Sequence, residues 1–423
     1  MRNGGAEELS EHHHQSRVRL PAEFWRLWTG QTVSMAGGQI ITLAIPYLAV
    51  TTLNASPLQM GFLTASGSLA NLVLGLHAGW LADRLNRRRL LIASNALRAV
   101  AVLVLPLGML LDLLGFWQLV VVSFTLGALE LVFFTTLSAY LPDLVHHESL
   151  EPANSWMQAT ENTGEVAGPG VAGLLITTIG VPLAVAINGV SYVVAAVLSA
   201  TLPNRVRAGE GEKESLGLTA GLRLLLRHPI LTPIAMATMH FNIFAGISAA
   251  LTMLFLVNTL HLNATLIGLI GMSGGAGGLI GAAITTRMSR RFGAIRLLST
   301  LYFLPGAASL LVPAAGLLSS RLGALAVVCV AEFLWSAMTI MMLVLGASIR
   351  QRVVPGHMLG RVSSSMRFLT WGIDPIGTLV GGVLGGLVGL SMGLLVGGIG
   401  CVLAGLWAVG GGLLRHIDPS GAS

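Results

Sequence analysis

Several ionisable side chains lie inside long apolar segments of the sequence, where a charge is costly and usually has a function. Glu161 and Glu165 are four positions apart and therefore share one face of a helix. Two neighbouring carboxylates repel each other when both are ionised, so one of them binds a proton more readily than an isolated carboxylate does. Reversible proton binding inside a membrane is what proton-coupled chemistry requires. The proton-coupling candidates are Glu130, Arg98, Glu161, Glu165, Asp374 and Glu332.

Glu130 ranks first among these candidates, because it is alone on an apolar segment and has no nearby helical partner. Arg98 lies about midway through the preceding segment, and an alternating Glu–Arg contact would couple proton release to helix movement. The alternative interpretation is structural: Glu161 and Glu165 form an ion pair with Arg98 or lie at the membrane interface. The sequence leaves both interpretations open.

Twelve apolar runs must position these residues. The chain has 423 residues, of which 54% are hydrophobic and 10% charged, and this composition excludes a soluble globular protein. The runs occupy roughly residues 24–52, 57–82, 90–111, 117–140, 156–179, 182–202, 230–258, 265–286, 295–317, 322–348, 362–388 and 391–413. Their length and their lack of alternation favour transmembrane helices over barrel strands. The predicted fold class is therefore an all-α integral membrane protein with twelve transmembrane helices.

The basic residues fall almost entirely on one side of the membrane if these runs alternate in direction. Of the 24 Lys and Arg residues, Arg98 and Arg367 lie within runs and Arg321 precedes the tenth run, and the other 21 share one side. The positive-inside rule then places both termini in the cytoplasm of a multi-pass protein of the inner (cytoplasmic) membrane. The pI of about 10.1 reflects this orientation rather than binding to nucleic acid.

A polar insertion divides the chain into two halves that resemble repeats of each other. Leu85-Asn-Arg-Arg88 aligns with Met288-Ser-Arg-Arg291 at an offset of 203 residues. We therefore expect two pseudo-repeated six-helix bundles, and some helix near Leu218–Arg227 within the insertion. The predicted parts are an N-terminal tail (1–22), an N-terminal bundle (23–203), a cytoplasmic linker (204–229), a C-terminal bundle (230–414) and a C-terminal tail (415–423).

The stretch Gly79-Trp-Leu-Ala-Asp83-Arg84-Leu-Asn-Arg87-Arg88-Arg89 joins the second and third runs. The positive-inside rule explains its arginines but not Asp83, which weakens the positive bias. The stretch resembles the loop signature of the major facilitator superfamily. The resemblance implies that Asp83 latches the outward-open state by meeting the N-terminal end of the eleventh span, around Gly360–Ser363. The implied conformational gate comprises Gly79, Asp83, Arg84, Arg87, Arg88, Arg361 and Arg367.

The fifth run contains a glycine-rich motif, Gly164-Glu-Val-Ala-Gly168-Pro169-Gly170-Val-Ala-Gly173. It resembles the antiporter signature of the same superfamily, and the matching residues are Gly164, Gly168, Pro169 and Gly173. A proline kink flanked by small residues gives a helix that bends and packs closely. The alternative interpretation is a plain glycine-rich membrane helix without a specific role in export.

Other short sequence segments are similar to sequences of one branch of this superfamily, which contains macrolide-efflux and siderophore-exporting proteins. They include Ser94-Asn-Ala-Leu-Arg98 and Pro355-Gly-His-Met-Leu-Gly360-Arg361. The fourth run departs from the family, because it lacks the arginine of the R-x-x-q-G signature that many drug exporters carry. This departure leaves the route of the proton open.

The resemblance implies a secondary active exporter with alternating access, driven by proton antiport. Its substrate would be a small amphipathic or apolar molecule, such as a drug, an antibiotic or a siderophore. Proton-coupled uptake by symport is the alternative, and counterflow in inverted vesicles would separate the two. An ATP-driven pump is excluded, because the only lysine, Lys213, does not lie in a P-loop.

The remaining expectations concern the partners of the chain. We expect a monomer in the lipid bilayer that binds a small molecule and protons, with no enzymatic activity, cofactor, metal or nucleic acid. Phe241, Phe244 and Trp335 are candidates for the apolar lining of the substrate cavity.

Overall fold

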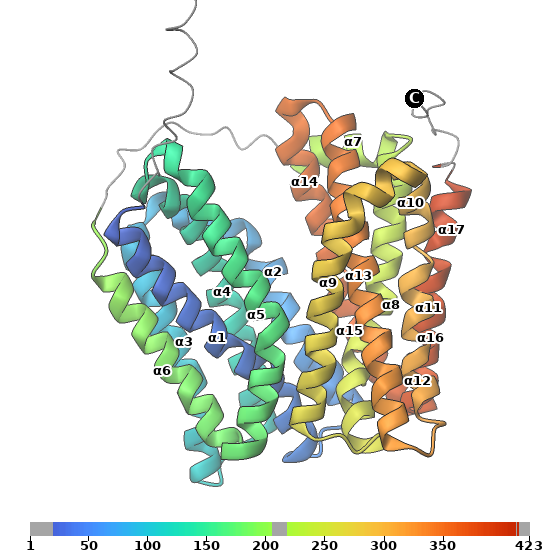
Figure 1. Ribbon diagram of the computed structural model, residues 1–423, viewed down its shortest axis with the longest axis horizontal. Coiled ribbons are helices and arrows are strands. Elements are labelled where there is room, and N and C mark those ends of the chain that lie inside the picture. The colour runs from blue at the N-terminus through green and yellow to red at the C-terminus, as the bar shows by residue number, and fades with distance from the viewer. Residues whose placement is uncertain (1–19, 205–217, 412, 414–423) are drawn as a thin grey trace, which may run out of the picture.

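A computed structural model describes residues 20–204, 218–411 and 413, without the side chains at 71, 75–80, 82, 83, 147, 218–220 and 357. Over these residues every regular element is a helix and no strand occurs. The helices form two groups that stand side by side, with α1–α6 in one group and α7–α17 in the other (Figure 1). We call these groups the N-half and the C-half.

The N-half contains six long helices. They are α1 (Ala22–Thr51), α2 (Pro57–Arg84), α3 (Arg87–Leu110), α4 (Phe116–Leu144), α5 (Leu150–Ile179) and α6 (Val181–Ala200), with the short turn η1 (His147–Ser149) before α5. Polar caps fix several helix starts. Ser56 and Gln59 form a capping box at the start of α2, and Asn86 accepts a hydrogen bond from the backbone N–H of Arg89 at the start of α3.

The C-half repeats this plan with more breaks. Its elements are α7 (Leu218–Arg227), α8 (Leu231–Leu254) with η2 (Phe255–Thr259), α9 (Ala264–Phe292), α10 (Ala294–Leu301), α11 (Leu304–Ser309), α12 (Leu311–Ala315), α13 (Arg321–Val353), α14 (Gly356–Trp371), α15 (Asp374–Val388), α16 (Leu390–Leu403) and α17 (Gly405–Gly410). The pieces α10–α12, α14–α15 and α16–α17 each continue one another along the same rod (Figure 1).

Corresponding turns of the two halves share an unusual backbone conformation. Asn54 and His261 have positive φ angles of 48° and 52°, and each stands two residues before a polar N-cap. Gly180 and Gly389, with φ of 81° and 85°, join α5 to α6 and α15 to α16. Glycine adopts this left-handed conformation without steric strain. The matched turns agree with the internal repeat that the sequence predicts.

Ten helical segments of the described chain are long and apolar enough to cross a membrane. The other two rods, α2 and α5, have 28 and 30 residues, which is also the length of a span. The architecture is therefore compatible with the twelve expected spans. The all-α membrane fold predicted from the sequence is confirmed.

Some predicted helix ends are wrong. The helix α5 begins at Leu150 instead of 156, and α13 continues to Val353 instead of 348. Helices extend past their apolar runs, because residues such as Glu, Gln and Arg also favour the helix outside the lipid. The eleventh span does not begin at Gly360–Ser363, because its first piece, α14, starts at Gly356. Gly360–Ser363 therefore lie inside the helix, and the positive end of its dipole is at Gly356.

The helix expected near Leu218–Arg227 is confirmed as α7. It packs against α14, since a Cβ atom on Gly221 would lie only 2.5 Å from the carbonyl oxygen of Arg361. Leu225 is fully buried in an apolar cluster of the C-half. The second part of the predicted linker is therefore built into the C-half.

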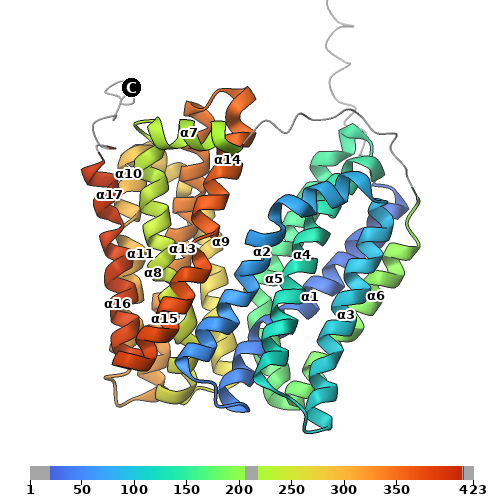
Figure 2. The same cartoon turned by 180° about the vertical axis from the view of Figure 1, so that it is seen from behind.

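The two halves touch at one end and diverge at the other (Figures 1 and 2). The diverging end carries α7 and the arginine-bearing turns between α2 and α3 and between α13 and α14. We call it the basic end, and the opposite end the closed end. The backbones of the two halves are therefore closest at the closed end and farthest apart at the basic end.

Candidate functional site

Glycines let α5 and α9 touch along their backbones at the closed end. A Cβ atom on Gly173 of α5 would overlap the carbonyl oxygen of Ala264 in α9. In the reverse direction, a Cβ atom on Gly268 of α9 would overlap the carbonyl oxygen of Pro169 in α5. Only a residue without a side chain fits at these positions, so this part of the closed end is sealed by backbone contact.

A second contact of the same kind joins α2 to α15. A Cβ atom on Gly61 would lie 2.7 Å from the carbonyl oxygen of Thr378, and one on Gly382 would lie 2.7 Å from that of Pro57. Both pairs connect the N-half to the C-half. The closed end is thus held by two glycine-lined contacts.

The four residues of the predicted antiporter-like motif face two different neighbours of α5. Pro169 and Gly173 contact α9, as described above. Gly164 and Gly168 contact α1 instead: a Cβ atom on Gly164 would lie 3.0 Å from the Sδ of Met35, and one on Gly168 would overlap the side chain of Gln39. The motif therefore lets α5 pack closely on both sides.

Asp374 bridges the two halves. Its Oδ2 accepts a hydrogen bond of 2.5 Å from the hydroxyl of Ser68, which lies in α2 of the N-half. The carboxylate stands at the first position of α15, where the helix dipole stabilises a negative charge. A cavity of about 280 Å³ adjoins the pair and is also lined by Asn242 and Trp371.

Arg98 is buried in the N-half between two aromatic rings. It is 4% exposed, and its Cζ lies 5.0 Å from the ring centre of Phe133 and 5.5 Å from that of Tyr192. Within the described residues no carboxylate oxygen lies within 4 Å of it. The predicted ion pair of Arg98 with Glu161 or Glu165 is therefore wrong for this conformation.

Glu130 is exposed on α4. It stands four positions before Phe134, which shares its helical face and borders a pocket between α1, α4 and α5. No hydrogen bond or ion pair of Glu130 is seen within the described part of the chain. Arg98 is close enough for an electrostatic interaction with Glu130 but does not touch it.

Glu161 and Glu165 share the cavity-facing side of α5, as their spacing predicts. Glu161 is half-buried and accepts a long hydrogen bond of 3.4 Å from Gln158 Nε2. Glu165 is exposed, one helical turn nearer the closed end. Glu161 lines the pocket between α1, α4 and α5.

Besides Asp374, the C-half contributes the acid Glu332 and a group of aromatic residues. Glu332 and Trp335 line a cavity of about 260 Å³ within the C-half. Phe241 is 2% exposed and stacks on Trp335 at 5.2 Å, while Phe244 stacks on His240 at 4.8 Å. Phe241 therefore belongs to the core, whereas Trp335 borders a cavity.

The expected gate lies at the basic end. The side chains of Gly79 and Asp83 are outside the described residues, so the contacts of these two positions stay a prediction. Arg84 and Arg367 are exposed, and Arg367 lies 5.6 Å from the ring centre of Trp371. Arg361 points a guanidinium N–H toward the sulfur of Met358 at 3.5 Å. Figure 2 shows that α2 and α14 diverge at this end.

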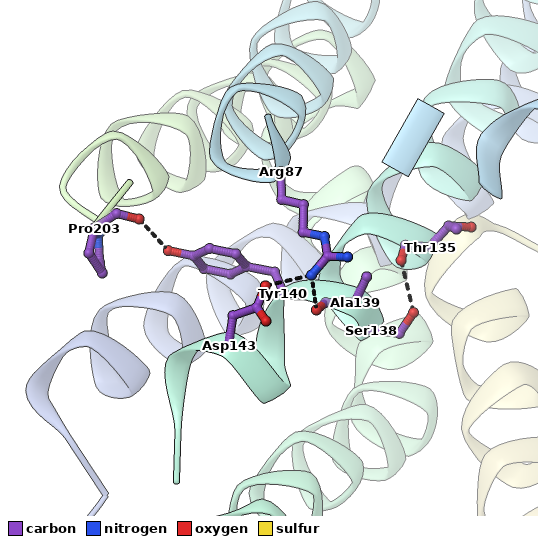
Figure 3. Close-up of polar contacts among 7 residues, drawn as sticks. All are labelled: Arg87, Thr135, Ser138, Ala139, Tyr140, Asp143 and Pro203. Carbon is purple, nitrogen blue, oxygen red and sulfur yellow. Dashed lines mark hydrogen bonds and ion pairs between the residues drawn. The ribbon is translucent and has the colours of Figure 1, made fainter. Parts of the chain in front are cut away.

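Two further arginines of the gate fasten the N-half together. Arg87 donates hydrogen bonds from Nη1 to Asp143 Oδ2 at 2.5 Å and to the carbonyl oxygen of Ala139 at 2.9 Å (Figure 3). The hydroxyl of Tyr140 donates to the carbonyl oxygen of Pro203 at 2.8 Å. These bonds tie the start of α3 and the chain after α6 to the end of α4. Arg88 likewise donates to the carbonyl oxygen of Ala200.

Asp143→Asn should lower the midpoint of thermal unfolding by about 2–5 °C, because it removes the charge-assisted bond to the largely buried Arg87. The midpoint is measured on the purified protein in detergent. Arg89→Ala, at an exposed position of the same turn, is the control. A shift no larger than that of the control would mean that the ion pair adds no stability.

Sequence reasoning did not find the Arg87–Asp143 pair or the Ser68–Asp374 bridge. Both join residues far apart in the chain, and the local sequence contains no signal for such a pairing. Among the described residues no group of three or more His, Cys, Asp or Glu side chains is arranged to hold a metal ion.

Two helical halves related by an internal repeat, with ionisable residues between them, are the architecture of a secondary membrane transporter. The chain matches the Major Facilitator Superfamily over residues 27–373, and it belongs to that family. It is a multi-pass membrane transporter.

Three relatives carry informative names. The chain is 27% identical over 392 residues to the uncharacterized MFS-type transporter YfiS of Bacillus subtilis. This alignment covers 90% of this chain and 91% of that protein. It is 26% identical over 400 residues to the multidrug efflux pump Tap of Mycolicibacterium fortuitum. This alignment covers 90% of this chain and 94% of that protein. It is 30% identical over 177 residues to macrolide efflux protein A of Streptococcus pyogenes. This alignment covers 41% of this chain and 43% of that protein. The resemblance to a macrolide-efflux branch is thus confirmed.

Solved structures agree with the fold. A bacterial homologue of the iron transporter ferroportin in its inward-facing state has a TM-score of 0.73 at 18% identity, covering 92% of this chain and 98% of that one. The outward-facing state of a bacterial ferroportin homologue has a TM-score of 0.53 at 20% identity, covering 92% and 99%.

Proposed function

We propose that this transporter is a secondary active exporter of a small amphipathic or apolar molecule, driven by proton antiport. The names of two relatives, a multidrug efflux pump and a macrolide efflux protein, support export over uptake. The two cavity-bearing halves and the repeated turns support alternating access, in which the halves rock around a site between them.

We place the basic end of the molecule in the cytoplasm, with both termini on that side. The arginine-bearing turns are concentrated there, as the positive-inside rule requires. In this orientation the protein is open to the cytoplasm and sealed toward the outside. An exporter takes up its substrate in this state.

The observation that carries the proposal is the contrast between the two ends. Backbone contacts at Gly173, Gly268, Gly61 and Gly382 seal the closed end, while the halves diverge at the basic end. Glu130 and Glu165 of the N-half are exposed, and in the proposed cycle a proton from outside reaches one of the carboxylates after the halves have rocked. The latch of Asp83 on α14 belongs to that second state, and the divergence of α2 and α14 is the arrangement expected when it is released.

The direction of transport is tested in two steps. A strain without its own pumps, expressing the protein, should become resistant to at least one compound of an amphipathic antibiotic panel. That compound, radiolabelled, should accumulate in everted vesicles with an acidic lumen, because antiport exchanges lumenal protons for substrate. Nigericin should abolish the accumulation. Accumulation only in right-side-out vesicles under an inward proton gradient would instead establish the uptake symporter.

The same experiment needs an independent check of sidedness. In a Cys329→Ser, Cys401→Ala background, a cysteine at Asn263 should react with an impermeant maleimide on intact cells. A cysteine at Ala208 should react only after the cells are permeabilised. Reaction of both on intact cells would contradict the proposed orientation.

A further inference from the structure

Two neighbouring cavities in the N-half share one wall. The first lies between α1, α4 and α5, has a volume of about 250 Å³ and contains Gln31 and Glu161; we call it the glutamate pocket. The second lies between α1 and α5, has a volume of about 430 Å³ and contains Trp28 and Trp156; we call it the tryptophan groove. Met35 of α1 lines both. The tryptophan groove is in the size range of small-molecule sites, about 300–1,000 Å³, and the glutamate pocket is slightly smaller.

The glutamate pocket offers hydrogen-bond acceptors without matching donors. Gln31 is 7% exposed, and its Oε1 is buried without a hydrogen-bond partner. The carboxylate of Glu161 receives only the long bond from Gln158. The amide nitrogen of Gln158 donates to Glu161 and to Asn162, and one N–H of Asn154 donates to the carbonyl oxygen of Leu150. Among the described residues that line the pocket there is no Lys or Arg.

The tryptophan groove offers apolar surface and no free hydrogen-bonding hydroxyl. The hydroxyls of Thr32, Thr160 and Thr163 donate to carbonyl oxygens of their own helices, and Trp28 Nε1 donates to Thr160 Oγ1 at 2.9 Å. The ring centres of Trp28 and Trp156 are 5.7 Å apart in an edge-to-face arrangement, and Trp156 is 47% exposed. Tryptophan faces bind flat apolar groups and attract cations.

We infer that these two cavities form one binding site for an amphipathic amine, and this inference rests on the proposed function. The protonated nitrogen donates its N–H groups to Glu161 and Gln31, and the apolar body lies against Trp28 and Trp156. Met35, an unbranched and flexible side chain, moves to connect the two compartments. A neutral ligand of the same shape leaves acceptors of the pocket without a donor, and an anionic ligand is repelled by the carboxylate of Glu161. The site therefore selects for a positively charged ligand.

Two fluorescent probes of nearly equal shape test this selection: 1-pyrenemethylamine, which is a cation at neutral pH, and 1-pyrenemethanol, which is neutral. Binding is titrated with the full-length protein in nanodiscs, and partition into empty nanodiscs is subtracted. The amine should bind the unmodified protein at least about tenfold more tightly than the alcohol, because a charge-assisted hydrogen bond contributes about 1.5 kcal/mol or more.

Glu161→Gln should remove most of that difference by weakening the amine alone, and its unchanged binding of the alcohol shows that the protein is folded. Trp156→Ala should weaken both probes. Glu151→Gln, at an exposed position near the start of α5, and Trp117→Ala, exposed on α4 and outside both cavities, should change neither.

Equal affinity of the two probes for the unmodified protein, or a Glu161→Gln variant that keeps the preference for the amine, would overturn the inference. This test needs no transport. If the amine binds as expected but no compound is exported from vesicles, the exporter proposal fails and the site remains. If export is found without selection for the amine, only the site is refuted.

Discussion

Gly173→Val should abolish transport while the protein is still made and inserted. The new side chain meets the backbone of α9 at Ala264, where not even a Cβ atom fits, so α5 and α9 must separate at the closed end. Overpacking of this kind costs about 1–3 kcal/mol, and each 1.4 kcal/mol changes a conformational equilibrium about tenfold. Because only the sealed state contains this contact, the variant shifts the protein toward the state that is open at the closed end.

Two measurements check this result. Substrate accumulation in everted vesicles should fall at least about tenfold, and a cysteine at Asn263, near the start of α9, should react faster with an impermeant maleimide. Gly386→Val is the matched control, because it lies in α15 and a Cβ atom there meets nothing within 4 Å. Normal transport by the Gly173→Val variant at normal protein levels would show that the backbone contact does not seal the protein.

The internal repeat gives the second contact, between α2 and α15, the same role. A Cβ atom on Gly382 of α15 would lie 2.7 Å from the carbonyl oxygen of Pro57 in α2, which is too close for a side chain. The two contacts lie on helices of both halves, so each rocking movement must break and remake both. Glycine is required at these positions because a larger residue would hold the helices apart in the sealed state.

The sequence predicts the helices well because the signal for a membrane span is local. A run of about 20 apolar residues identifies each span wherever it packs, and the distribution of arginines supplies an orientation. Even the short helix Leu218–Arg227 was predictable, since its leucines recur at helical spacing.

The partners of the ionisable residues could not be predicted in the same way. Arg98 was expected to pair with a carboxylate, but it lies between Phe133 and Tyr192, which come from two other helices. The bridge from Ser68 to Asp374 spans 306 positions of the chain. Without knowledge of which helices are neighbours, a charge in a span identifies a candidate but not its partner.

The residues that line the cavities could also not be predicted from the sequence. In a membrane helix, apolar residues face lipid, core and cavity alike, so hydropathy does not separate them. Phe241 was expected in a cavity and is in the core. Trp28 and Trp156 were not singled out, because their proximity depends on the packing of α1 against α5.

Glu130→Gln should abolish proton-driven accumulation but leave downhill exchange of substrate intact. Glu130 is exposed on α4, one helical turn from Phe134 of the glutamate pocket, and has no hydrogen bond or ion pair within the described residues. A carboxylate without a fixed partner is free to bind and release a proton, and glutamine of the same shape is not. A pH gradient equivalent to 100 mV supplies about 2.3 kcal/mol per proton, which supports about fifty-fold accumulation per proton.

The expected result is therefore a fall from roughly fifty-fold accumulation to none in everted vesicles, with counterflow retained. Arg98 keeps its place between the two aromatic rings in this variant, so the fold of the N-half should be unaffected. Glu148→Gln, exposed at the basic end, is the matched control and should transport normally. Loss of counterflow together with accumulation would mean that Glu130 binds substrate instead of protons.

Retention of proton-dependent accumulation by the Glu130→Gln variant would move the coupling site to another acid, and Asp374 is then the strongest candidate in the C-half. Its carboxylate is the candidate that bridges the halves, so its protonation would act directly on a contact that rocking must break. Two variants separate its charge from its bond. Asp374→Asn keeps an oxygen that accepts from Ser68 but cannot titrate, whereas Ser68→Ala removes the bond and keeps the charge. Coupling through Asp374 requires the first variant to lose proton dependence and the second to keep it.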